Sequence, residues 1–385
     1  MGKYKICFAG LLIVLLMILL AVGLLSSENH VYRWVFVYYM SYDNDLNVHG
    51  SRILSELEKG IINDEIAVVT QADFNDIKCM KRIAMYNSGG KTKRKELSVK
   101  SENSADANEL KKYFDWVRSN WKAENYCIVL LNHGGALDDM CKDERPFGEA
   151  KKNNKLIMAK WLSGIEAAKI IADFNRSVDN KVRLLFLQQC ARGSIQNLYS
   201  FTDTCQYLMA SPAKVGAPNT YYARTLQAAA KGPDITGKNI AQNIMLRDKD
   251  YTLYILFDCN ELKKLPEKLK PVLDSFVKPE NLKWPKECKP LFRYEDEEYY
   301  DLKSYFQSLS RTNGDICDKE LNAFFDWIDN ELIVTRRLND KSFDKSWQSG
   351  LSIYVPSDPS QLDRYDFLPI YKQTNLENLM RLTFQ

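Results

Sequence analysis

The chain has 385 residues, of which 45% are hydrophobic and 27% are charged, a composition that can bury a large core. Its 53 Lys and Arg residues nearly balance its 50 Asp and Glu residues, so the formal net charge is +3. This balance, without a basic stripe interleaved with aromatic residues, argues against a nucleic-acid partner. The length predicts two or three domains, or one large catalytic domain with an appendage.

An apolar run at residues 6–25 follows an amino end that carries Lys3 and Lys5. The run is long enough to span a bilayer as a helix. It also resembles a long secretory signal, with a weak cleavage pattern at residues 21–23. In both cases the rest of the chain crosses a membrane. We therefore expect a secreted, periplasmic or cell-surface protein, held at the membrane by this segment if it is not removed.

Segments typical of strands and of amphipathic helices alternate from residue 31 to residue 258. Strands are predicted at residues 31–40, 65–73, 81–87, 126–135, 182–190, 205–212 and 252–258. Helices are predicted at residues 43–60, 104–120 and 162–175, with two more helical stretches before residue 252. The charged stretch at residues 91–100 is predicted as a solvated loop. Buried strands alternating with helices predict an α/β fold, a mostly parallel central sheet between two helical layers.

After about residue 260 the pattern changes to proline-broken helices. Two further helices are predicted at residues 292–310 and 319–332, and a strand at residues 349–358. We therefore divide the chain into a signal or anchor at 1–28, a catalytic-type α/β domain at 29–260, and a smaller α+β portion at 261–385 that packs on it.

Two chemically suggestive residues each follow a buried strand. His133 ends the strand at 126–135, and Cys190 ends the strand at 182–190. Taken singly, His133 is compatible with a structural role and Cys190 with an inert buried thiol. Parallel strands bring ligand-binding residues to their shared carboxyl edge, so the two side chains are expected near each other there. A thiol beside an imidazole forms the nucleophile and base of a cysteine hydrolase.

Two glycines follow His133. Without side chains, Gly134 and Gly135 allow a substrate carbonyl to approach the backbone. An N–H at Gly134, together with that of Cys190, is placed to bind a developing oxyanion. The alternative is a tight turn that needs a positive φ.

The motifs at these positions resemble a known peptidase family. The stretches "VYYMSYDNDLN", "NHGG" and "SGLSIYVP" look like the opening strand, histidine motif and closing segment of the clostripain-like peptidases, family C11, relatives of the caspases in clan CD. "QQCARG" is similar to the caspase signature around the nucleophile. The resemblance implies a caspase-like three-layer sandwich and a peptide-bond hydrolase with His133 and Cys190 as its dyad. It requires no metal or cofactor for the dyad, although some members depend on calcium.

Residue 188 departs from the pattern that the resemblance implies. Members that cut after Arg or Lys carry an aspartate two residues before the nucleophile, where this chain has Gln188. A neutral amide is a poor partner for a guanidinium group. Gln188 remains a candidate substrate-binding residue, and Asp203 is a candidate acid that compensates for it.

Family members also mature by cutting themselves between the histidine and the cysteine. Here residues 141–155 form a charged segment in that interval, predicted as an exposed loop. We hypothesise cleavage near Lys151 or Lys152; the alternative is an ordinary charged loop.

The sequence therefore predicts a cysteine endopeptidase that acts on peptides or proteins, with cleavage after Arg or Lys and self-cleavage as finer expectations. The competing hypothesis is a catalytically inactive caspase-like scaffold that binds peptides or partners at the cell surface. Nine cysteines without a C-x-x-C pair predict no zinc site.

Overall fold

The computed structural model describes residues 30–75, 79–147, 151–152, 155–156, 158–277, 282–283, 285, 288–339, 349–382 and 384. The apolar run at residues 6–25, predicted as a signal or anchor, lies outside these residues. No helix within the described part of the chain is both long enough and apolar enough to cross a membrane.

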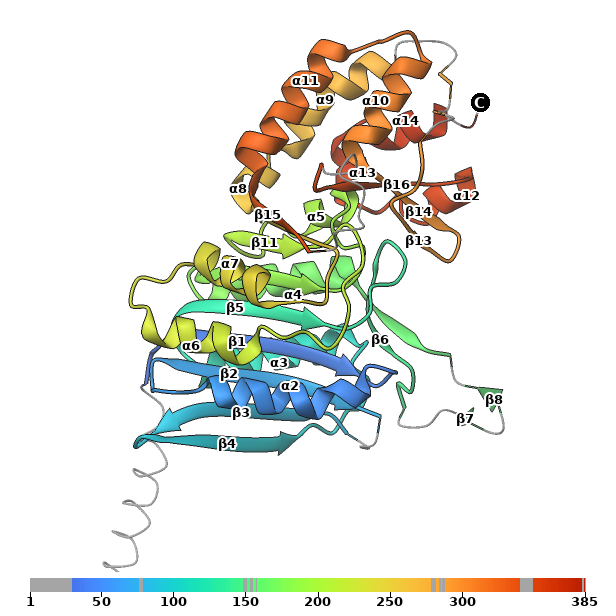
Figure 1. Cartoon of the computed structure of the whole chain (residues 1–385). Helices are drawn as coiled ribbons and strands as arrows, with labels where there is room; N and C mark the ends of the chain where they lie inside the picture. Colours follow the sequence, from blue (N-terminus) through green and yellow to red (C-terminus); the bar gives the residue numbers. More distant parts are fainter. Residues whose placement is uncertain are drawn as a thin grey trace, which may run out of the picture.

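A nine-stranded sheet forms the centre of the molecule (Figure 1). Its strands are β1 (Tyr32–Tyr42), β2 (Ile66–Phe74), β3 (Lys81–Ser88), β4 (Lys91–Ser98), β5 (Ala123–Leu131), β10 (Val182–Gln188), β11 (Tyr207–Ala210), β12 (Leu253–Asp258) and β15 (Ile333–Leu338). Their order is β15-β12-β11-β10-β5-β1-β2-β3-β4. The strands from β11 to β2 run parallel, and the strands outside them pair antiparallel. The predicted α/β class with a mostly parallel central sheet is confirmed.

Helices cover both faces of this sheet. Helices α2 (Asn47–Gly60), α6 (Tyr222–Lys231) and α7 (Gly237–Arg247) lie on one face, and α3 (Ala107–Asn120) and α4 (Gly164–Ser177) on the other (Figure 1). Successive side chains of a strand point to opposite faces, so alternate residues of β1 serve two cores. Val35, Val37 and Tyr39 pack in the core with α3 and α4. Phe36 and Tyr38 pack in the core with α2 and α6.

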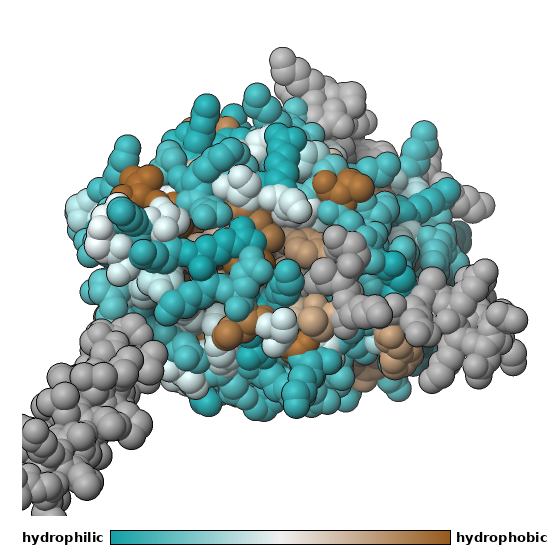
Figure 2. Space-filling model, turned by 90° about the horizontal axis from the view of Figure 1, so that it is seen from below, coloured by the Kyte–Doolittle hydropathy of each residue, from teal (hydrophilic) through white to brown (hydrophobic). Residues whose placement is uncertain are grey.

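One sheet edge differs from the prediction. Residues 91–98 form strand β4, where the sequence predicts a solvated loop at 91–100. Every residue of β4 is exposed, which is why its apolar content does not reveal a strand. The face seen from below is mostly hydrophilic, with only separate hydrophobic areas (Figure 2). Charged side chains on an edge strand discourage pairing with another chain.

A second difference lies between the two candidate residues. Residues 141–155 are predicted as one exposed loop, but their first part belongs to β6 (Asp139–Asp143), which pairs antiparallel with β9 (Lys160–Ser163). Cys141 in β6 is completely buried. Farther along, β7 (Lys151–Lys152) and β8 (Lys155–Leu156) pair as a hairpin, which projects from the body of the molecule in Figure 1.

The chain after β12 builds a helical layer and a small sheet. Its helices are α8 (Cys259–Leu262), α9 (Leu265–Val277), α10 (Leu302–Thr312), α11 (Asp318–Trp327), a π-helical turn (Ile328–Leu332), α12 (Pro359–Asp363), α13 (Pro369–Gln373) and α14 (Leu376–Leu382). The antiparallel sheet contains β13 (Phe292–Tyr294), β14 (Glu297–Asp301) and β16 (Ser352–Val355). The predicted helix at 292–310 is therefore wrong in its first half, because tertiary pairing turns 292–301 into a hairpin. The chain also returns to the central sheet through β15, which pairs with β12.

Candidate active site

Strands β5 and β10 are neighbours in the sheet and run parallel. Leu131 pairs with Gln188 in their register, and His133 and Cys190 each follow two residues later. The two residues therefore leave the sheet side by side at its carboxyl edge. Their loops also touch, because a Cβ atom on Gly134 would overlap the carbonyl oxygen of Cys190. The absence of a side chain at Gly134 is what allows this approach.

The Cys190 thiol occupies a partly buried position next to Val215. The Val215 N–H donates to Sγ at 3.3 Å, and Sγ lies 3.5 Å from the Val215 carbonyl oxygen. Burial raises the pKa of Cys190 above its usual value, while the Val215 N–H, Arg192 and Lys214 counteract part of that rise. The thiol therefore rests in its neutral form at neutral pH.

The backbone after Cys190 is held in a tight turn. Ala191 adopts a left-handed conformation with φ of 55°, which costs a side-chain-bearing residue about 1–2 kcal/mol. Hydrogen bonds fix the turn, from the Ala191 N–H to the Ala213 carbonyl at 3.0 Å and from the Gly193 N–H to the Ser211 carbonyl at 2.8 Å. The surrounding structure thus compensates for the strain and determines where the thiol points.

His133 contacts an acidic residue from the loop after β1. Its Nε2 atom lies 2.6 Å from Asp45 Oδ1, and this hydrogen bond holds the pKa of Asp45 below its usual value. The two loops are also joined behind the imidazole, where Asn44 donates to the Asn132 side chain at 3.2 Å and to the Lys142 carbonyl at 2.9 Å. The ring is therefore oriented from its Nε2 side, which leaves Nδ1 as the nitrogen available for another partner.

Arg192 connects the loop after His133 to the loop that contains Cys190. Its side chain is completely buried, and its Nε donates to the Cys190 carbonyl at 3.1 Å. The remaining guanidinium nitrogens donate to the carbonyls of Gly135, Ala136, Leu137 and Asp139, at 2.8–3.2 Å. A planar fork of fixed donors is suited to collecting several carbonyls at once. One guanidinium thus binds the loop that follows His133 to the loop that contains Cys190.

The two glycines after His133 have different surroundings. The Gly135 N–H donates to the Asp139 carbonyl at 3.0 Å, so this group is already bonded. Gly134 sits against the Cys190 carbonyl and is the better candidate for an oxyanion donor. Gly134 and Gly135 are not among the described glycines with a positive φ. A tight turn that needs a positive φ therefore does not explain why these two residues are glycines.

Gln188 lies deeper than the edge where Cys190 leaves the sheet. It is 4% exposed. Its amide nitrogen donates to the side chains of Asn219 and Tyr222, and its amide oxygen accepts from the Tyr221 hydroxyl at 2.6 Å. Asn219 in turn donates to Asp248 at 2.7 Å. The amide is therefore engaged in a buried network.

Asp203 does not reach this network. It precedes β11, next to the amino end of β10, where the Gln206 N–H bonds to the Val182 carbonyl. Its carboxylate pairs with Lys263 at 2.8 Å and is 64% exposed. Because parallel strands have their amino ends at the opposite edge from Cys190, Asp203 is wrong as the acid that compensates for Gln188.

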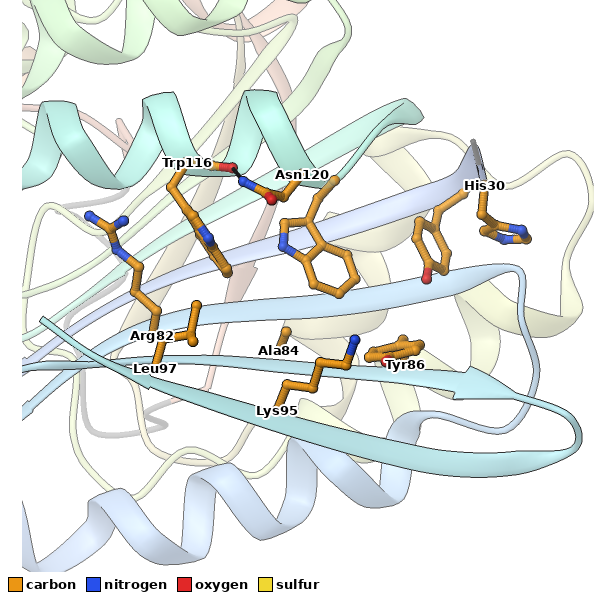
Figure 3. Close-up of a pocket in the computed structure, with 10 residues that line it drawn as sticks. His30, Arg82, Ala84, Tyr86, Lys95, Leu97, Trp116 and Asn120 are labelled. Carbon is orange, nitrogen blue, oxygen red and sulfur yellow. Dashed lines mark hydrogen bonds between the residues drawn. The ribbon is translucent and has the colours of Figure 1, made fainter. Parts of the chain in front are cut away.

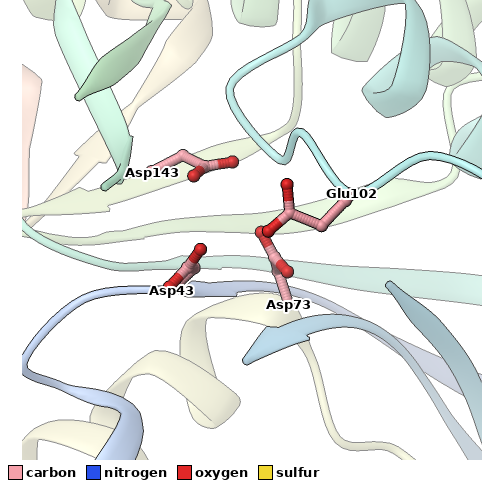
Figure 4. Close-up of side chains that lie close together, drawn as sticks. All are labelled: Asp43, Asp73, Glu102 and Asp143. Atoms are coloured by element: carbon pink, nitrogen blue, oxygen red, sulfur yellow. The ribbon is translucent and has the colours of Figure 1, made fainter. Parts of the chain in front are cut away.

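A cluster of acidic residues lies beside the Asp45 loop (Figure 4). Its members are Asp43, Asp73, Glu102 and Asp143, all buried, with carboxylates that turn toward one another. Arg145 donates from Nε to Asp43 Oδ1 at 2.8 Å. Burial, and secondly the charge of Asp143, raise the pKa of Asp73 to about 9. Burial also raises the pKa of Asp143, to about 6. These oxygens are of the type that hard cations bind.

A separate cavity lies at the other end of the sheet (Figure 3). It has a volume of about 180 Å³ and is lined by Tyr32, which begins β1, together with Tyr86, Trp116 and Trp121. Lys95 lies over the Tyr86 ring, with Nζ at 5.5 Å from its centroid. Because β1 runs from this cavity to the Asp45 loop, the cavity is remote from Cys190.

Three features of the carboxyl edge, where His133 and Cys190 lie, were not predicted from the sequence. Asp45 and Asp43 are in a motif that the resemblance uses, but their roles depend on which loops β1 and β5 bring together. Arg192 appears in the sequence only as a basic residue after a cysteine, and nothing in the pattern reveals that its partners are carbonyls. The acidic cluster draws on segments between residues 43 and 143, whose contact follows from the strand order β5-β1-β2.

A family model described as the clostripain family, peptidase C11, matches residues 38–378. Clostripain of Hathewaya histolytica is 27% identical over 262 residues, which cover 58% of this chain and 47% of that protein. The chain thus spans about half the length of the curated relative it matches.

Solved structures with a similar fold include two from the same family. A secreted C11 cysteine protease from Bacteroides thetaiotaomicron in complex with an irreversible peptide inhibitor superposes with a TM-score of 0.67 at 16% identity, over 89% of this chain and 99% of that one. An inactive zymogen C11 protease from Parabacteroides distasonis gives a TM-score of 0.66 at 17% identity, over 90% and 99% of the two chains.

Proposed function

Because this chain belongs to the clostripain family of cysteine peptidases, we propose that it hydrolyses peptide bonds with Cys190 as nucleophile and His133 as acid–base group. The observation that carries the proposal is the joint exit of both residues from β5 and β10, with Gly134 against the Cys190 carbonyl. A noncatalytic scaffold has no need for this convergence.

In the proposed reaction, His133 Nδ1 accepts the thiol proton as Sγ attacks the scissile carbonyl carbon. The Asp45 carboxylate on Nε2 stabilises the imidazolium that forms. The N–H groups of Gly134 and Cys190 stabilise the tetrahedral oxyanion. The imidazolium then protonates the leaving amine, and water, activated by the neutral imidazole, hydrolyses the thioester. Proton transfer accompanies attack because the resting thiol is neutral.

The test is a peptide-library cleavage assay with the full chain, kept in detergent because of its apolar amino end. Cys190→Ala and His133→Gln are expected to lower cleavage by at least about a thousandfold. Cys79→Ala, which alters another partly exposed thiol, serves as the control and retains wild-type activity. Appreciable cleavage by Cys190→Ala would refute the proposal. A wild-type chain that binds peptides without cutting any of them would establish the scaffold alternative.

Cleavage after Arg or Lys is the finer part of the proposal, and its support is the family resemblance. Gln188 supplies no negative charge, so a basic residue before the scissile bond lacks a charged partner at this position. Hydrogen bonds to charged groups contribute about 1.5–3 kcal/mol. Gln188→Asp is therefore expected to raise the ratio of kcat/KM for Arg over Gln substrates by roughly tenfold or more. A wild-type ratio near one contradicts the Arg or Lys preference.

Self-cleavage near Lys151 or Lys152 is also part of the proposal. The support is the hairpin of β7 and β8, which projects from the body in the interval between His133 and Cys190 (Figure 1). Projecting segments are the preferred sites of nicking. We expect two fragments from the wild type and one intact chain from the double variant Lys151→Ala, Lys152→Ala, judged by mass spectrometry. Lys160→Ala is the matched control, and an active wild type that stays intact refutes self-cleavage.

The proposed site of action is outside the cytoplasm, on secreted or surface-accessible peptides. The support is the apolar run at residues 6–25, together with a similar fold in a secreted protease. Fractionation of cells that produce the full chain tests it, and recovery only in the cytoplasm contradicts it. The same fractions show whether the chain remains attached to the membrane through that run.

A further inference from the structure

Two cysteines come into contact at the amino end of β11, the sheet edge opposite to Cys190. Cys205 precedes β11, and Cys259 begins α8 directly after β12. These two strands pair antiparallel, and the Cys259 N–H donates to the Gln206 carbonyl at 3.1 Å. This pairing brings the two Sγ atoms to 3.5 Å from each other. An S–S bond measures about 2.0 Å, so the sulfur atoms need to approach by roughly 1.5 Å to be joined.

The two thiols differ in how well they are shielded from solvent. Cys205 is 7% exposed and Cys259 is 1% exposed. The hydrogen bond with Cys205, and secondly burial, raise the pKa of the Cys259 thiol well above its usual value, so Cys259 stays neutral at neutral pH. A thiol is a weak hydrogen-bond donor, so the reduced pair contributes little to the stability of the fold.

An open cavity gives small molecules a route to one of the two sulfur atoms. It has a volume of about 590 Å³, and Cys205 is among the residues that line it, whereas Cys259 is not among those described there. The charged side chains of its lining are Arg176, Arg183, Lys263 and Asp203. This excess of positive charge favours an anionic reactant. Cys205 is therefore the thiol that such a reactant reaches first.

We propose that Cys205 and Cys259 form a disulfide in the exported protein, by exchange with an anionic small-molecule disulfide of the glutathione type. Cys205 Sγ loses its proton and attacks one sulfur of the reagent, whose S–S bond breaks and releases one thiolate. Cys259 Sγ then loses its proton and attacks the Cys205 sulfur, which releases the second thiolate. The two protons convert both thiolates to thiols. The cysteine pair is thus oxidised by two electrons, and the reagent is reduced by two.

The bond joins the central sheet to α8, which begins the helical layer after β12 (Figure 1). It links residues that are 54 positions apart, so it removes conformational entropy from the unfolded chain. Disulfides persist in oxidising compartments outside the cytoplasm. Formation in the cell therefore rests on the proposed location, whereas the chemistry of the bond is independent of peptidase activity.

The test uses the full-length Cys190→Ala chain, in which the proposed nucleophile takes no part in exchange. The folded chain is incubated with excess oxidised glutathione, alkylated, and digested without reduction. Mass spectrometry is expected to find the Cys205 peptide joined to the Cys259 peptide. The melting temperature is expected to rise by at least about 3 °C, a gain that dithiothreitol removes. Adding Cys79→Ala, which removes a partly exposed thiol, is the matched control and changes neither result.

Single substitutions in the same chain test the order of the two attacks. With Cys259→Ser, glutathione is expected to remain on Cys205 as a mixed disulfide, whereas with Cys205→Ser, Cys259 stays unmodified. The reverse pattern overturns the assigned order. A parent chain in which both cysteines remain free thiols, or pair with other cysteines, overturns the cross-link itself.

Cells that produce the full chain, quenched with an alkylating agent, test the bond at its proposed location. A chain recovered outside the cytoplasm is expected to carry the bond. Recovery there with both cysteines as free thiols overturns its formation in the cell, even where the same chain cleaves peptides. Recovery only in the cytoplasm overturns the location, and with it the formation of the bond in the cell.

Discussion

Cys190 lies half-buried at the carboxyl edge of the sheet, in surroundings that favour its neutral form. Burial is the largest influence on its pKa, and the neighbouring Val215 N–H and cations only partly oppose it. In this respect Cys190 differs from thiols that rest as thiolates beside a positive charge. The proposed nucleophile therefore depends on His133 to remove its proton during attack.

The pH dependence of Cys190 alkylation follows from this raised pKa. We expect its rate with iodoacetamide, measured by mass spectrometry of the Cys190 peptide, to keep rising above about pH 8.5, the ordinary thiol pKa. The neutral thiol also contributes stability below its unfolded-state pKa, and this contribution is lost as pH rises through the folded-state pKa. The alkylation rate of the same cysteine in the urea-denatured chain, measured at each pH, provides the reference. A rate that levels off below about pH 7 would reveal a resting thiolate instead.

The loops after β5 and β10 form one unit because Arg192 lies between them. Its guanidinium donates hydrogen bonds to backbone carbonyls of both loops, those of Cys190 and Gly135 among them. Because these carbonyls are buried, loss of the guanidinium leaves them without partners. Arg192 is thus a positioning residue rather than a group that touches the scissile bond.

Two substitutions at Arg192 separate folding from positioning. Arg192→Met is expected to lower the free energy of unfolding by about 3 kcal/mol or more, measured by urea denaturation. Arg192→Lys keeps the charge but not the fork, so we expect a folded protein whose kcat falls more than its KM rises. Arg183→Lys is the control, because Arg183 lies within β10, the strand that precedes Arg192, and has a side chain that is only partly buried. Wild-type kcat in Arg192→Lys argues against positioning.

Strands that are apolar along their whole length were predicted correctly. Segments that are strands only because a neighbouring strand pairs with them were not predicted. The strands at 126–135 and 182–190 are recognisable because central parallel strands are apolar on both faces. Strand β4 is charged along its length, and it is a strand only because β3 offers it a partner. Residues 292–301 have helix-compatible composition, yet they pair with each other and with β16.

The carboxyl-terminal third of the chain forms hydrogen bonds with the loops that carry His133 and Cys190. The Ser352 N–H donates to the Gly193 carbonyl at 2.9 Å, and the Gln196 side chain bonds both the N–H and the carbonyl of Tyr354. On the histidine side, the Leu137 N–H donates to Glu297 at 2.8 Å. The small sheet therefore supports both loops that Arg192 joins.

A chain that ends at residue 260 is expected to lack a cooperative fold. It loses β15, which leaves the edge of β12 unpaired, and it loses the contacts from Glu297 and Ser352. We expect the truncated chain to show no sharp thermal transition by circular dichroism, whereas the full chain unfolds in one step. A truncated protein with a sharp transition and peptidase activity would contradict this dependence on the carboxyl-terminal portion.

The sequence by itself determined the fold class and the two candidate residues, because apolar strands and the polar residues that end them are local patterns. It also determined the family resemblance, which the family match confirms. Only the tertiary structure decided what surrounds Cys190 and His133. The partners of Arg192, the acidic cluster, the Asp45 contact and the position of Asp203 all depend on strand order and register. These place residues distant in the chain at one edge, or at opposite edges, of the same sheet.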